Sequence, residues 1–432
     1  MIENFFLTHN FNLIQTLIVA IGYLMPFPLA YIAFSLWHHY RQENFIMGIK
    51  WVLLEIQVPR DVIKTPAAME LIFSNAFYHK SLKGFWEEFM IGAPWLWFSL
   101  EIVSIDGRVH FYIRTPTHIR DLVETQIYAQ YPQAKIVEAD DYVWNVPQYT
   151  KNGDWNMWGC EFNKMKDDVL PIKTYKQVDE MKSGTKEEFK IDPITPTIEF
   201  LGSLAKGQQM WIQIVIRQNI KKYHGPLTHK HLNIYDYGEE FIRNMLEPYT
   251  KYGKGAGFGG IDTFEVRAPG FLDPLVKQMA ICLQQIHFDV GVRIITLSDK
   301  RIVSEEKFQE LRRSSRLIFR QFAQPFSNEL NRINSTQFDA PWSDPTGLAL
   351  TKIKKRMLNF YRMRTFFHPP LQYAFKYPSL LSVFFPSGKP SIFVLSAEEL
   401  ASLYHFPGMV SETPSFKRIE SKIAKPPSNL PV

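Results

Sequence analysis

The alternation of apolar and polar residues between positions 51 and 138 predicts a small α+β unit. Strand-like alternation occurs over residues 51–58, 98–102 and 109–113, and Asp106-Gly107 marks a hairpin turn between the last two. Apolar residues at helical spacing follow Thr65-Pro66 and Thr115-Pro116, where Thr is the expected N-cap and Pro the first helical residue. A short strand is expected over residues 134–138. The resulting order, β-α-β-β-α-β, is that of a ferredoxin-like, split βαβ fold.

A weaker copy of the same pattern follows. A third Thr-Pro pair, Thr195-Pro196, begins a helix, and Ile212, Ile214 and Ile216 alternate as in a strand. The later elements of this copy are a helix over 272–287, a strand over 290–297 and a helix over 304–322. The repeated Thr-Pro starts favour duplication of one unit. Residues 220–270 are predicted to be an insertion, and residues 165–193 a flexible connector.

The N-terminal segment has a different character, because residues 4–40 carry no formal charge. Residues Phe11 to Trp37 form an apolar run long enough to cross a bilayer as a helix. Pro26 and Pro28 are expected to kink this helix or to divide it. Arg41 and Lys50 follow the run, so the positive-inside rule places residues 41–432 in the cytoplasm. We therefore expect a single-pass protein of the bacterial inner membrane.

These patterns predict an α+β protein in which an N-terminal transmembrane helix precedes two ferredoxin-like modules. The expected domains are a membrane anchor at 1–43, a first module at 45–150, a second, insertion-bearing module at 151–325, a basic segment rich in aromatic residues and proline at 326–395, and a tail at 396–432. A chain of 432 residues with 46% apolar and 21% charged residues has enough apolar material for such cores.

The composition excludes several classes of site. Two cysteines, Cys160 and Cys282, cannot form a disulfide framework or a multi-cysteine metal site, and reduced thiols are favoured over a single disulfide. The glycine cluster at 253–260 lacks the Gly-Lys-Ser/Thr of a phosphate-binding loop. We therefore predict no catalytic, cofactor or metal residues and a protein that is not an enzyme.

The alternative to a protein without enzymatic activity is a membrane-bound hydrolase. It would use the glycine cluster together with three histidines and an aspartate: His224, His229, His231 and Asp236. These four residues lie in a polar stretch without the close spacing of zinc ligands. A solvated loop is therefore the favoured interpretation.

Charge is concentrated in one segment of the chain. From Lys300 to Arg364 there are fourteen Lys and Arg residues against six Asp and Glu. The candidate residues for binding DNA or anionic lipid are Lys352, Lys354, Lys355, Arg356, Arg362 and Arg364, which are interleaved with aromatic residues. Contact with anionic lipid is favoured over DNA for a membrane-anchored domain, with a solvated helix face as the simplest alternative.

Several stretches resemble a membrane-anchored domain family of ultrasmall uncultured bacteria (Patescibacteria). They are Trp51–Pro59, Phe98–Ser104, Glu124–Pro132, Trp158–Cys160, Pro171–Tyr175 and Trp211–Val215. The stretch Leu395–Pro407 is similar to the segment that leads into the motor domain of FtsK-like, type IV secretion or conjugation ATPases. In relatives a P-loop ATPase continues beyond the end corresponding to residues 426–431, so this resemblance implies that the motor here is a separate polypeptide.

The resemblance implies a non-catalytic component of a type IV secretion, conjugation or pilus-like system that anchors and positions a P-loop ATPase. The tail is the expected contact, through Glu398, Glu399, Leu400, Leu403, His405 and Pro407. The equally favoured alternative is that Leu400, Leu403 and Phe406 complete the chain's own core. Membrane lipid is a second expected partner, and DNA and a second copy of the chain stay open. A membrane-anchored DNA-binding scaffold that uses residues 300–364 is the main alternative function.

Overall fold

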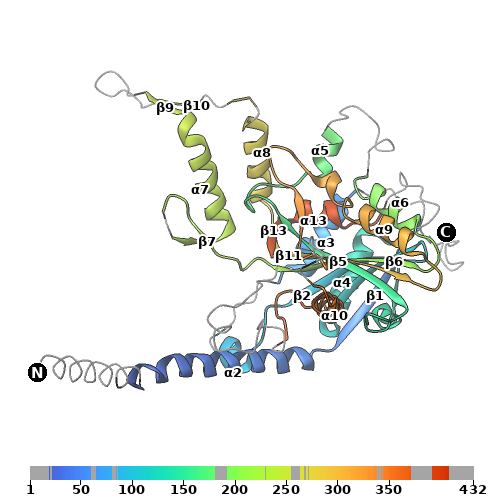
Figure 1. Ribbon diagram of the computed structural model, residues 1–432. Helices are drawn as coiled ribbons and strands as arrows, with labels where there is room; N and C mark the ends of the chain where they lie inside the picture. Colours follow the sequence, from blue (N-terminus) through green and yellow to red (C-terminus); the bar gives the residue numbers. More distant parts are fainter. Residues whose placement is uncertain are drawn as a thin grey trace, which may run out of the picture. The chain divides into compact units, whose positions relative to one another are not determined.

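The computed structural model describes most of the chain, and the element labels below are those of Figure 1. The described residues are 19, 22–59, 65–79, 84, 86–180, 192–228, 230–253, 263–266, 269–270, 272–337, 342, 344–370 and 392–407. Two compact units are distinguished. The first comprises residues 1–50, 81–94 and 368–389, and the second comprises 51–80, 95–367 and 390–432.

The described part of the first unit is built around one helix, α2 (Pro26–Gly48). Its partner is a short π-helix, Trp86–Ile91. The rings of Phe34 and Phe89 stack with centroids 6.2 Å apart, and Arg41 Nε donates to the Met90 carbonyl at 3.1 Å. These contacts hold the π-helix against the middle of α2.

Of the predicted membrane span over residues 11–37, the structure describes residues 19 and 22–37. Residues 22–24 are helical, Met25 is a turn residue and α2 begins at Pro26, so the described helical run is divided directly before Pro26, which is one of the two expected effects of the prolines. Pro28 lies in the first turn of α2, where a missing N–H is tolerated. The helix extends past Trp37 through polar residues to Gly48. Residues 11–18, 20 and 21 lie outside the described part. Within the described part, no helix combines the length and the apolar character needed to cross a membrane.

The second unit is an α+β structure with a nine-stranded antiparallel sheet. Eight strands form a continuous path in the order β12-β5-β11-β6-β2-β3-β1-β4, and β13 pairs with β11 beside β5. Their bounds are β1 Trp51–Gln57, β2 Trp97–Ile105, β3 Arg108–Pro116, β4 Lys135–Glu138, β5 Trp155–Lys164, β6 Gln208–Gln218, β11 His287–Asp299, β12 Leu330–Ile333 and β13 Phe393–Ser396.

The strand order repeats in the two halves of the sheet. In one half β1 lies between β4 and β3, and β2 lies at the middle of the sheet. In the other half β5 lies between β12 and β11, and β6 lies at the middle. The halves meet where β2 and β6 pair, with Trp97 opposite Arg217 and Ile105 opposite Gln209. The sheet is therefore continuous across both halves, and its two central strands have no exposed edge.

One face of the sheet is covered by helices that the Thr-Pro pattern partly predicted. They are α3 (Ala67–Ile72) with the π-helix Phe73–Phe77, α4 (Arg120–Gln130), α5 (Tyr175–Glu180), α6 (Thr195–Gly202), α9 (Glu305–Ser315) and α13 (Ala397–Leu403). Leu54, Leu100 and Ile212 belong to the large apolar core on this face. The expected Thr caps are not used: the N-cap of α6 is Ile194, and the Thr115 hydroxyl is directed to the Pro116 carbonyl.

Helix α10 (Leu348–Met363) covers part of the opposite face. Met357, Leu358 and Tyr361 pack there in a second core with Leu53 and Trp211. Because successive strand residues point to opposite faces, β2, β6 and β11 are buried on both sides. The polar residues that alternate with apolar ones in β2 are therefore internal and not solvent-facing.

In its described residues, the predicted insertion contains α7 (Ile234–Leu246), β7 (Tyr223–His224), β8 (His231–Leu232), β9 (Thr250–Gly253) and β10 (Thr263–Val266). The helix predicted over 272–287 follows as α8 (Leu272–Leu283). The prediction of a flexible connector over 165–193 is wrong for its first part, since Ile172 and Thr174 are fully buried. Residues 181–191 lie outside the described part. Cys160 and Cys282 are buried free thiols, as the sequence favoured.

We predict that Gly291 in β11 is required because the Phe366 ring lies where a Cβ would be. Gly291→Ala should lower the free energy of unfolding by about 1–3 kcal/mol through overpacking. The same change in a Phe366→Ala background should be neutral or stabilising by up to about 1 kcal/mol, because alanine suits a strand better than glycine. Urea unfolding of the four members of this double-mutant cycle measures both effects, and equal costs in the two backgrounds would contradict the contact.

Candidate functional site

A row of polar side chains crosses the sheet on the face that α10 covers. In the strand register Glu101 lies opposite Gln213, Gln213 opposite Arg293, and Arg293 opposite Glu161. On its other side Glu101 lies opposite Tyr112. All five side chains are buried. Side chains directly opposite each other on one face are close enough to bond, so a continuous polar ladder runs across the middle of the sheet.

Arg364 joins this row from the C-terminal end of α10. Its Nε donates to Glu101 Oε1 at 2.9 Å, and its Nη1 donates to Asp141 Oδ2 at 2.5 Å. The arginine side chain is 1% exposed and the glutamate 0%. Arg364 has a left-handed backbone conformation, φ 51°, which ends the helix and turns the chain over the sheet.

In this cluster, pairing between opposite charges outweighs the effect of burial on the pKa values of Glu101 and Arg364. Burial acts to raise the pKa of Glu101, but the charge of Arg364 and the hydrogen bonds that Glu101 accepts outweigh it and lower that pKa. Burial likewise acts to lower the pKa of Arg364, and the two carboxylates raise it instead. The Tyr142 hydroxyl donates to Glu101 Oε2 at 2.8 Å and lies 2.8 Å from the Tyr361 hydroxyl.

A second ion pair continues the row. Arg293 Nη2 donates to Glu161 Oε1 at 2.7 Å, and Nη1 donates to Gln213 Oε1 at 3.3 Å. The guanidinium carbon lies 4.8 Å from the centre of the Phe366 ring. Since these charged groups already have partners, they are suited to holding α10 and residues 364–367 on the sheet.

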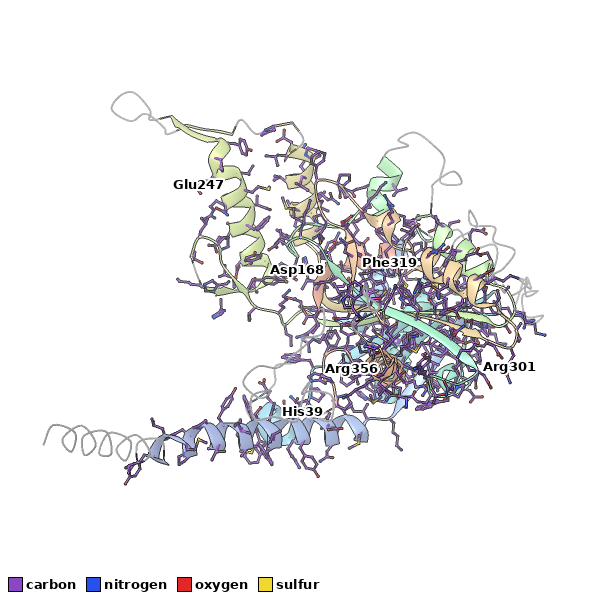
Figure 2. All side chains as sticks on the ribbon, in the orientation of Figure 1. His39, Asp168, Glu247, Arg301, Phe319 and Arg356 are labelled. Atoms are coloured by element: carbon purple, nitrogen blue, oxygen red, sulfur yellow. The ribbon has the colours of Figure 1, made fainter. Side chains whose placement is uncertain are left out.

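The six predicted basic residues separate into two groups. Arg362 and Arg364 are buried, and Arg362 donates to the Val146 carbonyl and to Gln148 Oε1. These two are therefore not part of a binding surface, because their charges are used inside the fold. Lys352, Lys355 and Arg356 are exposed on α10, and Lys354 is partly buried. Figure 2 labels Arg356 on this helix.

The predicted docking residues are placed in the chain's own core. β13 pairs antiparallel with β11, with His287 opposite Ser396 and Val290 opposite Phe393, and α13 follows directly. Glu398, Glu399, Leu400, Leu403 and His405 are each no more than 3% exposed, and Pro407 is also buried. The proposed docking surface is thus corrected: these side chains bind this chain, as the alternative interpretation held for Leu400, Leu403 and Phe406.

The polar members of this segment have internal partners. Glu399 pairs with Lys164 at 2.9 Å, accepts from the Ile172 backbone N–H and forms a capping box with Ser396. Glu398 pairs with Lys176 at 2.8 Å, and His405 Nε2 lies 2.6 Å from Asp192 Oδ1. Buried charges are tolerated only when paired, so these contacts explain why acids can occupy the core.

The histidine and glycine candidates do not form a site in the described residues. His224 and His231 lie opposite each other in the β7–β8 pair, with ring centroids 5.5 Å apart. Asp236 lies in the first turn of α7, while His229 and residues 254–260 are outside the described part. No group of three His, Cys, Asp or Glu residues that suits a metal ion occurs among the residues the structure describes.

Comparison with protein-family models finds no match for this chain. Comparison with curated proteins finds none either.

We predict that breaking the central ion pair is far more costly than replacing it. Arg364→Met or Glu101→Gln alone should each destabilise the fold by about 3–5 kcal/mol, because each leaves a buried group without its partner. The double variant should cost less than the sum of the two. Urea unfolding at neutral pH measures the cycle, and strict additivity would show that the two residues do not interact.

The same pair predicts a pH dependence. The pKa of Glu101 is lower in the folded than in the unfolded chain, so its contribution is present above the ordinary value of 4.5 and is lost as pH falls through the folded pKa. The stability difference between the wild type and Glu101→Gln should therefore shrink below about pH 4.5. If the stability difference between the two proteins stayed constant as pH fell from 4.5 to the folded pKa of Glu101, a lowered pKa for Glu101 would be contradicted.

Proposed function

We propose that this protein is a membrane-anchored, non-catalytic scaffold of a type IV secretion, conjugation or pilus-like system, and that it positions a separate P-loop ATPase. The observation that carries the proposal is the apolar surface of α2 and of the helical residues 22–24 before it. Tyr23, Leu24, Phe27 and Tyr31 are 77%, 66%, 74% and 64% exposed. Apolar exposure of this extent marks a contact surface and is unfavourable in water.

The proposed contact of this helix is the bilayer of the bacterial inner membrane. Aromatic side chains are spread along α2, and the polar run Arg41, Gln42, Glu43 and Asn44 lies near its C-terminal end at Gly48. Aromatic residues are enriched where hydrocarbon meets the headgroups, and charged residues lie outside it. This arrangement supports an anchor whose C-terminal end emerges at the membrane surface, with residues 41–432 in the cytoplasm.

For the second unit we propose two ferredoxin-like modules joined side by side. The repeated strand order, with the first strand between the fourth and the third, is the order of a split βαβ fold. In one half α3 follows β1 and α4 follows β3. In the other half α6 follows β5 and α9 follows β11. The pairing of β2 with β6 supports a rigid platform, because it buries both inner edges.

A scaffold role is also supported by how the charged groups are used. Glu101, Glu161 and Asp289 are buried and bonded to Arg364, Arg293 and Arg217, respectively. Such pairs favour one arrangement of packed elements. The segment 392–407 adds to this rigidity, because it inserts β13 and α13 into the platform and brings Pro407 to a fixed place.

We predict that the exposed face of α2 is needed for membrane association. Replacing Leu24, Phe27 and Tyr31 together by Gln should move the protein from the membrane to the soluble fraction, since each buried apolar side chain contributes roughly 1.5–3 kcal/mol. Co-flotation with vesicles measures this. The matched control replaces Leu71, Ile281 and Leu317 by Gln, which are 51%, 51% and 57% exposed in the other unit. If the α2 variant floated with vesicles as well as the wild type does, the proposal that α2 is the membrane anchor would be wrong.

The ATPase proposal is tested by co-purification from native membranes in mild detergent. The full chain should bring down a stoichiometric P-loop ATPase, and a chain that ends at Pro407 should not. Truncation before Ser396 is unsuitable, because it removes β13 and α13 from the sheet and core. Unfolding curves of the two chains provide the control. Recovery of no ATPase with the full chain would reject the proposed function.

A further inference from the structure

Helix α10 presents an uncompensated positive surface. Residues 348–363 contain five Lys and Arg residues and no Asp or Glu. The three exposed ones, Lys352, Lys355 and Arg356, are spaced by three and four residues and so lie on one face of the helix. The opposite face carries Met357, Leu358 and Tyr361 into the second core. The positive face is therefore held in a fixed orientation by the packing beneath it.

Lys354 lies on the side of α10 opposite to Lys352 and approaches Tyr149, in the segment between β4 and β5. Its ammonium lies 3.4 Å from the Tyr149 hydroxyl and 4.8 Å from the centre of that ring, and is bonded to no carboxylate in the described residues. Burial lowers the pKa of Lys354 to about 8; the charge of Glu305 opposes this, and the charges of Lys300 and Arg312 contribute less. Holding a charged lysine here costs stability, which a bound anion would offset.

Basic residues also lie near the edge of the sheet that β5 forms, on α9. α9 contributes Phe308 and Leu311 to the core on one face, and α10 contributes Met357 to the core on the other. Of the described strands, only β12 pairs with the outer edge of β5, at residues 161–164. The guanidinium carbon of Arg316, in the residue that ends α9, lies 5.9 Å from the centre of the Trp158 ring of β5, and Met357 of α10 lies against Gly159 of the same strand. The ends of the two helices therefore flank this part of β5 from opposite faces. Arg313 is exposed beside Arg312.

We propose that this basic stripe, formed by Lys352, Lys354, Lys355 and Arg356 of α10 with Arg312 and Arg313 of α9, binds the phosphate backbone of a nucleic acid without sequence preference. A polyanion with closely spaced charges can follow a stripe that bends around a sheet edge. A flat bilayer would meet only one side of it. The inference does not depend on the proposed ATPase partner, and either can fail without the other.

The test uses the full chain in mild detergent and a labelled DNA duplex of about 20 base pairs, with binding followed by fluorescence anisotropy over about 50–200 mM salt. The variant Lys352→Glu, Lys355→Glu and Arg356→Glu changes only exposed side chains, so the fold is retained. Its affinity should fall at least tenfold. The slope of log affinity against log salt should become shallower by about 0.9 for each phosphate that the variant no longer neutralises.

The matched control reverses three exposed lysines, two of the insertion and one of α8: Lys222→Glu, Lys230→Glu and Lys277→Glu. It has the same net charge and should bind within about twofold of the wild type, because it leaves the stripe intact. Equal weakening by both triple variants would overturn the proposal, since it would show a response to net charge alone.

Lys354→Met separates a binding role from a structural one. It should raise the midpoint of thermal unfolding, because a desolvated charge is removed, and weaken DNA binding several-fold. A purely structural lysine would leave the affinity unchanged. Two outcomes overturn the proposal: no DNA binding by the wild type at about 50 mM salt, or a loss of binding to phosphatidylglycerol vesicles, and not to DNA, in the α10 triple variant.

Discussion

The buried pairing of Arg364 with Glu101 and Asp141 is the interaction on which the second face of the sheet depends. It joins the central strand β2, the loop after β4 and the end of α10, which are far apart in the chain. An ion pair in a core is unfavourable unless geometry and hydrogen bonds are complete, and here both carboxylates receive guanidinium hydrogens. The pairing therefore favours one placement of α10 over any sliding along an otherwise apolar surface.

That placement decides which charges are available for binding. The side chains of Arg362 and Arg364 are buried and bind groups inside the fold. The turn at Arg364 brings Phe366 over Gly291. The same packing directs Lys352, Lys355 and Arg356 outward. A run that reads as uniformly basic thus divides into an internal group that orients the helix and an external group that is free to meet an anion.

The C-terminal segment shows the limits of sequence reasoning most clearly. Leu395 to Pro407 looks like a connection to another domain, yet it supplies a strand and a helix to the platform. Its partner strand β11 begins more than a hundred residues earlier, and strand pairing over that separation leaves no local signal. β5 was missed for a related reason: Glu161 and Lys164 interrupt its apolar pattern, and only their buried partners explain them.

The sequence by itself determined the local elements: strands β1, β2, β3 and β6, the hairpin at Asp106-Gly107 and most of the covering helices, because periodicity and turn chemistry act between near neighbours. It also indicated an α+β protein with repeated units. Only the tertiary structure decided that β2 and β6 join the halves, that six expected docking residues are internal, and which basic residues remain outside. Burial and partnership arise from contacts between distant segments, and such contacts are not encoded in the spacing of any one of them.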